Sequence, residues 1–236
     1  MRRVLAVVDD AAGAAAVVGV AEAVAEVLHA DVQEVQLAIG TGEQDAATVV
    51  LRELERTGTL LCVLADTSSR VRSWWIVHRS TKPVVLLPPL LKPPMAPHKV
   101  ISRVLLPLDG SFEAAAAVTE TADLFTRTGV DLVVLHVFDK ATVPRFWDQA
   151  AHAQQAWEEE FLARHCAYPG VRMELRSGVA GEQVVNVAAA EQVDLIALGW
   201  SQHIIEGRAR TVRRCVAGAG VPVMLIPVAR HGEPSP

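Results

Sequence analysis

The residues with the most evident binding chemistry lie in the last third of the chain, around Gly199. An apolar run at 195–198 is short enough for a strand buried on both faces, and Gly199 ends it. Thr211 is a candidate N-cap for a helix over 211–218, and a second apolar run follows at 221–228. The stretch predicts a strand–loop–helix–strand unit whose loop follows the carboxyl end of a strand. Ligands of open α/β sheets usually bind at that place.

Two arginines, Arg208 and Arg210, come just before Thr211 and suggest anion-binding chemistry. Guanidinium groups form charge-assisted hydrogen bonds with phosphates, and a helix amino terminus adds N–H donors. Arg208 and Arg210 are therefore candidate ligands of a phosphate or another anion. The alternative is a solvated or salt-bridging face, because arginine opposes the dipole at a helix start but its long side chain can reach elsewhere.

Catalytic and metal-binding motifs are not recognisable in the sequence. No Ser–His–acid, HExxH or paired-carboxylate arrangement occurs at a familiar spacing. Cys62, Cys166 and Cys215 are far apart and form no CxxC, so neither a zinc knuckle nor a disulfide framework is indicated. We therefore expect no catalytic residues, no metal site and buried thiols in a cytoplasmic protein.

Composition excludes several classes of partner. The 236 residues suffice for one large domain or two smaller ones, and 51% are hydrophobic, which allows a substantial core. A net charge of −5 argues against a general nucleic-acid binder. No run approaches the roughly 18 uncharged apolar residues of a membrane span. Asp9 and Asp10 end the first apolar run too early for a signal peptide. We expect a cytoplasmic protein that binds neither nucleic acid nor membranes.

A proline-rich segment divides the chain into two parts. Five prolines between residues 88 and 99 cannot continue a helix or a central strand, so we interpret 89–99 as a semi-rigid linker. The predicted domains then span 1–88 and 100–229, and residues 230–236 are expected to form a disordered tail.

The two parts repeat each other. Arg3–Asp9 aligns with Arg103–Asp109, and Lys82–Pro88 aligns with Val221–Pro227. The offset grows from 100 to between 135 and 139, so the first part lacks about 35 residues. In the first part we expect strands at 3–9, 33–39, 60–65 and 83–88, and helices at 12–29, 44–57 and 73–79. In the second we expect strands at 103–109, 131–138, 171–176, 193–199 and 221–228, and helices at 112–127, 145–166, 181–191 and 211–218.

The alternation of strands and helices predicts an α/β fold with parallel sheets and right-handed crossovers. We expect two doubly wound domains, the first lacking about one strand and one helix. Proline stands at both ends of the last strand of each part, at Pro83, Pro88, Pro222 and Pro227. Proline cannot donate to a ladder, so these strands should be sheet edges that need a cover. The two last strands can cover each other, or another chain can do so.

The second part resembles a universal stress protein domain. The resemblance rests on Val104–Ser111, Leu135–Val137, Asp194–Gly199 and Val221–Pro227. The first part resembles a shortened version, so the whole chain is similar to a tandem universal stress protein. The resemblance implies Rossmann-type domains that pair through their last strands, and it implies further homodimerisation.

Nucleotide-binding members of that family carry a Gly-x2-Gly-x9-Gly-Ser/Thr loop. Here Gly199 is kept, Gln202 and Arg210 replace the other two glycines, and the loop is two residues shorter. The resemblance places six residues where such proteins contact ATP: Pro107, Asp109, Val137, Leu198, Gly199 and Thr211. Asp109 would hydrogen-bond a nucleoside, or it would instead form a turn and cap with Gly110 and Ser111.

Two hypotheses follow. The first is a non-catalytic stress-response or regulatory module without the usual ATP loop and without a bound cofactor. Such a module would act through a weakly bound small ligand or an unknown protein partner, for which Trp74 and Trp75 are candidates unless they fill the space left by the missing helix. The alternative is a protein that binds ATP or another adenine nucleotide in the second domain, with slow hydrolysis.

Overall fold

The computed structural model describes residues 1–8, 11–37, 43–66, 70–91, 100–139, 143, 151–200 and 206–228. The strands are β1 (Arg3–Val8), β2 (Asp31–Gln36), β3 (Thr59–Ala65), β4 (Val84–Leu87), β5 (Arg103–Pro107), β6 (Asp131–Phe138), β7 (Arg172–Ser177), β8 (Leu195–Trp200) and β9 (Val223–Pro227). The helices are α1 (Ala11–Leu28), α2 (Glu43–Glu55), α3 (Arg70–Arg79), α4 (Phe112–Arg127), α5 (Ala151–His165), α6 (Ala180–Ala190) and α7 (Glu206–Gly218).

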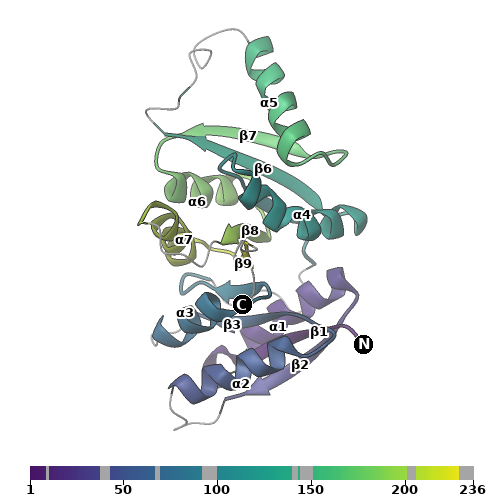
Figure 1. Cartoon of the computed structure of the whole chain (residues 1–236), viewed down its shortest axis with the longest axis vertical. Helices are drawn as coiled ribbons and strands as arrows, with labels where there is room; N and C mark the ends of the chain where they lie inside the picture. The colour runs from purple at the N-terminus through teal and green to yellow at the C-terminus, as the bar shows by residue number, and fades with distance from the viewer. Residues whose placement is uncertain are drawn as a thin grey trace, which may run out of the picture.

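All nine strands belong to one sheet, in the order β2-β1-β3-β4-β9-β8-β5-β6-β7 (Figure 1). We call residues 1–91 the first half and residues 100–228 the second half. Strands within each half are parallel, as short apolar runs joined by helices predict. β7 and α5 have no counterpart among the described residues of the first half. The prediction of an α/β fold whose first part lacks one strand and one helix is therefore confirmed.

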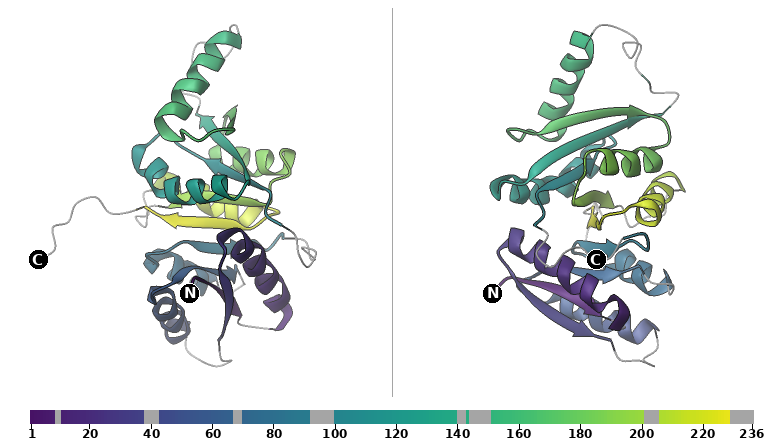
Figure 2. Two further views of the ribbon diagram at one scale, coloured as in Figure 1. Left: turned by 90° about the vertical axis from the view of Figure 1, so that its right-hand side faces the viewer. Right: turned by 180° about the vertical axis from the view of Figure 1, so that it is seen from behind.

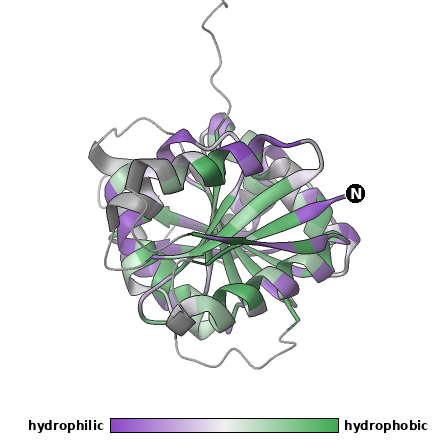
Figure 3. Ribbon diagram, turned by 90° about the horizontal axis from the view of Figure 1, so that it is seen from below, coloured by the Kyte–Doolittle hydropathy of each residue, from purple (hydrophilic) through white to green (hydrophobic). Residues whose placement is uncertain are grey.

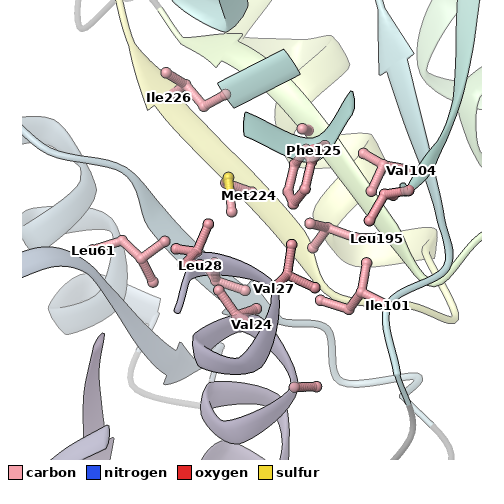
Figure 4. Packing of buried hydrophobic residues seen from close by; sticks show 14 of the residues in the cluster. Val24, Val27, Leu28, Leu61, Ile101, Val104, Phe125, Leu195, Met224 and Ile226 are labelled. Atoms are coloured by element: carbon pink, nitrogen blue, oxygen red, sulfur yellow. The ribbon is translucent and has the colours of Figure 1, made fainter. Parts of the chain in front are cut away.

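The halves meet where β4 and β9 pair antiparallel, with Val85 opposite Met224. β4 and β9 are the last strands of their halves, and each has proline at its ends. Each would otherwise be an exposed sheet edge, and their pairing covers both edges. Two hydrophobic clusters, one on each face of the sheet, contain residues of both halves. Figure 4 shows one of them, where Val27 and Leu28 of α1 approach Met224 and Phe125. The core is therefore continuous across the junction.

Helices cover both faces of the sheet (Figure 2). α1, α4 and α5 contribute to one cluster, and α2, α3, α6 and α7 contribute to the other. Figure 3 shows strands that are mainly hydrophobic and helices that carry both hydrophobic and hydrophilic residues. This distribution is typical of a sheet buried on both faces. In the part of the chain that the structure covers, no helix has the length and apolar character that crossing a membrane requires.

Some predicted boundaries are wrong. α7 begins at Glu206, so Thr211 lies inside that helix and is not its N-cap. Residues 206–210 contain no proline, and glutamate, alanine and arginine favour a helix, so nothing stops it from starting early. α3 likewise begins at Arg70 rather than at residue 73. The start of the predicted helix 145–166, most of the predicted linker and the predicted tail lie outside the described residues.

Candidate functional site

The second half contains a cavity of about 130 Å³ at the carboxyl ends of β5, β6 and β8. β5 and β8 are neighbours in the sheet, but the connection after β5 runs through α4 to β6 and the connection after β8 runs through α7 to β9. These connections leave in opposite directions and open a crevice at this edge. The cavity is lined by fourteen residues: Pro107, Leu108, Asp109, Ala114, Leu135, Val137, Ala180, Val184, Leu198, Gly199, Trp200, Thr211, Val212 and Val228. All six residues that the resemblance placed at a nucleotide site are among them.

Asp109 shapes the mouth of the cavity by holding a turn. Its Oδ1 accepts hydrogen bonds from the Ser111 N–H at 2.9 Å and the Ser111 hydroxyl at 2.6 Å. Gly110 between them has a φ of +83°, a conformation that favours glycine. The Ser111 hydroxyl oxygen in turn accepts from the Ala114 N–H and caps α4. The predicted turn and cap are therefore present, with Ser111 as the capping residue, and Asp109 also lines the cavity.

Helix α4 packs so closely against Gly199 that little room is left for a side chain. A Cβ at this position would lie 3.2 Å from the Ala114 carbonyl oxygen and 3.3 Å from the Ala114 Cα. These are backbone atoms of α4 and cannot rotate away as the end of a side chain can. The retained glycine therefore has a packing role that needs no phosphate nearby.

The arginines are placed differently from the prediction. Arg210 is exposed, lies within α7 and is not among the described residues that line the cavity. Arg208 is also part of the helix, but its side chain lies outside the described residues. Both arginines therefore lie within α7, Arg208 in its first turn, and do not precede the helix as the expected start at residue 211 implied. Further along α7, Arg214 forms an ion pair with Glu182 of α6.

Trp200 is a lining residue that was not predicted. The expected strand ends at residue 199, but β8 extends through Trp200, whose side chain is only 2% exposed. The alternation of Ile196, Leu198 and Trp200 on one face of β8 would have revealed it. Its indole Nε1 is buried and has no hydrogen-bond partner among the described residues.

Trp74 and Trp75 are half-buried on α3, where they pack against the core. Trp74 reaches the second half and contacts the Trp200 ring, with centroids 6.0 Å apart. The Arg79 guanidinium lies over the ring of Trp75 at 4.0 Å. Both indoles therefore pack between elements on the cluster of α2, α3, α6 and α7, whereas α5, which the first half lacks, packs against the other cluster.

His136 lies behind the cavity, next to the lining residue Val137. Its Nδ1 is 2.9 Å from the Leu108 carbonyl oxygen, and since a carbonyl can only accept, Nδ1 carries the proton. Burial lowers the pKa of His136, although the Leu108 hydrogen bond and the charge of Asp109 oppose this shift. The Phe138, Phe161 and Trp157 rings surround it at centroid distances of 4.6–5.3 Å. His136 is thus a neutral part of the packing that holds α5 to the sheet.

The cysteines are buried and unpaired, as expected. Burial raises the pKa of Cys62 and Cys215 to about 12 and that of Cys166 to about 11, so all three thiols stay protonated. No group of three or more histidine, cysteine or acidic side chains within the described ranges is arranged to hold a metal ion. The cavity itself offers an apolar enclosure with one carboxyl and one hydroxyl group, from Asp109 and Thr211, which suits binding.

Comparison with known proteins shows a family match and solved structures of similar fold. Residues 101–227 match the model of the universal stress protein family. The fold is similar to that of a universal stress protein from Archaeoglobus fulgidus DSM 4304, with 15% identity over 96% of each chain and a TM-score of 0.63. It is also similar to a functionally unknown protein from Pseudomonas aeruginosa PAO1, with 12% identity over 97% of this chain and 93% of that chain and a TM-score of 0.61. A comparison with curated proteins gave no match.

Proposed function

This chain belongs to the universal stress protein family, and we propose that it is a non-catalytic regulatory module that binds a small, largely apolar ligand in the cavity of its second half. The observation that carries the proposal is the lining of the cavity. Among the described lining residues, only Asp109, Thr211 and Trp200 have side chains with polar atoms. None of the lining side chains is basic. An apolar pocket with few polar groups is the usual form of a small-molecule site.

The same lining argues against tight binding of a triphosphate. Asp109 is the one acidic side chain among these residues, and a carboxylate at the mouth repels phosphate groups. The family's phosphate loop would bring glycine backbone N–H groups to the phosphates. Here Gln202 and Arg210 stand at two of its three glycines, and packing against α4 explains the third, Gly199.

A second candidate function is the binding of ATP or another adenine nucleotide. The observation that favours it is the convergence of six residues from separate strands and a helix on one cavity, at the positions that the resemblance indicated. In that case Asp109 would accept a hydrogen bond from the nucleoside, and Arg208 would replace the missing glycines near the phosphates.

The experiment is titration calorimetry of the full chain with adenosine, indole, AMP, cyclic AMP and ATP, the last with magnesium, together with an assay of phosphate release. The proposal predicts saturable binding of adenosine or indole, weaker binding as phosphates are added, and no phosphate release. If neither neutral probe binds at millimolar concentration, the ligand-binding proposal fails. If ATP binds at micromolar concentration and more tightly than adenosine, the nucleotide function replaces it.

We propose the wider arrangement on the same basis. Residues 1–88 and 100–229 would be two domains joined by a linker at 89–99 and held together through β4 and β9. The protein would act in the cytoplasm, as a homodimer or with a protein partner, because the family resemblance favours those roles.

A further inference from the structure

Trp200 belongs to the wall of the cavity and to the contact between the two halves. We propose that the first half regulates the cavity of the second half through this side chain, so that filling the cavity and seating α3 are energetically coupled. The inference rests on the proposed function, since it concerns the regulation of the same site. It assigns a role to the first half, whose own strands carry no counterpart of Trp200.

On the cavity side, Trp200 is held tightly. Its carbonyl oxygen accepts a hydrogen bond from the Val228 N–H at 2.9 Å, and it is paired with Pro227 in the β8–β9 ladder. Val228 also lines the cavity, as do Leu198 on β8 and Val212 on α7. The ring is only 2% exposed, so its position is fixed by what it packs against.

On the other side, the ring contacts α3 of the first half. The Trp74 ring meets it edge-on, with centroids 6.0 Å apart and planes at 62°, and the His78 ring lies 5.5 Å from it. Trp74 and His78 also contact each other at 6.3 Å. The Arg213 guanidinium of α7 lies 5.7 Å from the Trp74 ring and closes the cluster from the second half.

This arrangement couples the two places because one residue, Trp200, both lines the cavity and contacts α3. A ligand that presses on Trp200, or that gains contacts with it, favours one position of the ring over others. A change in the position of the Trp200 ring would change its packing against the rings of Trp74 and His78. Coupling between two sites is reciprocal, so α3 must affect the affinity of the cavity by the same factor as the ligand affects the seating of α3.

The coupling concerns the cavity of the second half only. β3 ends at Ala65, the equivalent of Trp200 at the end of β8, and a methyl group cannot span from a cavity to the other half. Within the described part of the chain the buried Trp200 Nε1 has no partner, which is unfavourable, and sites that tolerate such a group are often functional. The Trp200 indole therefore lies, at a cost in stability, where the second half contacts the first.

The test is a comparison of Trp74→Ala with Trp75→Ala in the full chain, with adenosine and indole as calorimetric probes. Trp75 is a matched control because it lies on the same helix, is also half-buried and, among the described ring contacts, has none with Trp200. Trp74→Ala should weaken probe binding about fivefold or more, whereas Trp75→Ala should change it less than twofold. Equal effects of the two substitutions would overturn the proposal. Trp74→Phe, which keeps a ring, should restore most of the affinity.

A second measurement keeps the coupling testable if neither probe binds and the proposed function fails. Val137→Phe, which fills the cavity from β6, replaces the ligand, and hydrogen exchange reports on residues 74–79 of α3. The coupling predicts altered exchange of α3 in Val137→Phe and no such change when Trp74→Ala is added. Unchanged exchange of α3 in a folded Val137→Phe protein would refute the coupling.

Discussion

Asp194 links the start of β8 to the start of β5 by hydrogen bonds. Its Oδ2 accepts hydrogen bonds from the Ser102 N–H, the Ser102 hydroxyl and the Arg103 N–H, at 2.8–3.1 Å, and the residue is 5% exposed. Asp194→Ala would leave these donors without an acceptor, so we expect a loss of about 2–3 kcal/mol in the free energy of unfolding. Urea denaturation measures this loss.

The control is Asp123→Ala, which removes an exposed ion pair with Arg127 on α4. Such pairs contribute little, so its effect should stay below about 0.5 kcal/mol. If the two substitutions cost the same, Asp194 does not hold the strands together.

His136 makes stability depend on pH. Burial lowers its pKa in the folded protein, whereas the unfolded chain has the ordinary value of about 6.5. Below that value the unfolded state binds more protons, so this contribution to stability is complete at neutral pH and is lost on acidification. His136→Gln keeps a polar side chain with N–H donors but does not titrate.

We therefore expect the fall in unfolding free energy between pH 7 and pH 5 to be smaller in His136→Gln than in the unaltered chain. Urea denaturation at both pH values tests this. His165, whose pKa burial also lowers, contributes to the remaining dependence. An unchanged fall in the variant would show that His136 is not responsible.

At the scale of elements, α4 packs against β8 closely enough to require glycine at position 199. Gly199→Ala would bring a Cβ to 3.2 Å from the Ala114 carbonyl oxygen, so we expect a loss of about 1–3 kcal/mol and a displaced α4. Gly19→Ala in α1 is the control, because nothing lies within 4 Å of a Cβ there. That substitution should raise stability by about 0.5–1 kcal/mol, since alanine favours a helix. Thermal and urea unfolding of both variants would decide, and a neutral Gly199→Ala would contradict the packing role.

Much of the arrangement of elements could be predicted from the sequence. Apolar runs of strand length and the internal repeat determine the strands of both halves and the missing strand and helix. Boundaries that rest on one residue were less reliable, as Thr211 shows, because a capping residue is equally acceptable inside a helix that starts earlier.

The candidate site was predictable only in part. The resemblance located six lining residues, and the structure adds the apolar side chains that enclose them, such as Val184 on α6 and Val212 on α7. Their convergence depends on helices packing against strands far away in the sequence. The contact between Trp74 and Trp200 spans both halves, and no local pattern reveals it.

At the scale of the whole molecule, the pairing of β4 with β9 makes each half depend on the other. In a chain limited to residues 100–236, β9 would be an apolar edge strand whose Val223–Ile226 are now at most 5% exposed. We expect this fragment to self-associate, or to bind a fragment of residues 1–91, because an uncovered apolar edge favours pairing. Sedimentation of the separate and mixed fragments tests this. If the fragment stays monomeric at high concentration and does not bind the fragment of residues 1–91, the second half does not depend on the β4–β9 pairing.

We propose that the cavity of the second half binds a small, largely apolar ligand and not a triphosphate. The ratio of the dissociation constants of magnesium ATP and adenosine for the full chain, determined by calorimetry, tests this. We expect a ratio of about ten or more, since Asp109 lines the cavity and no described lining residue is basic. A ratio below one, with ATP binding lost in Asp109→Ala, would contradict it and would identify the protein as a nucleotide binder.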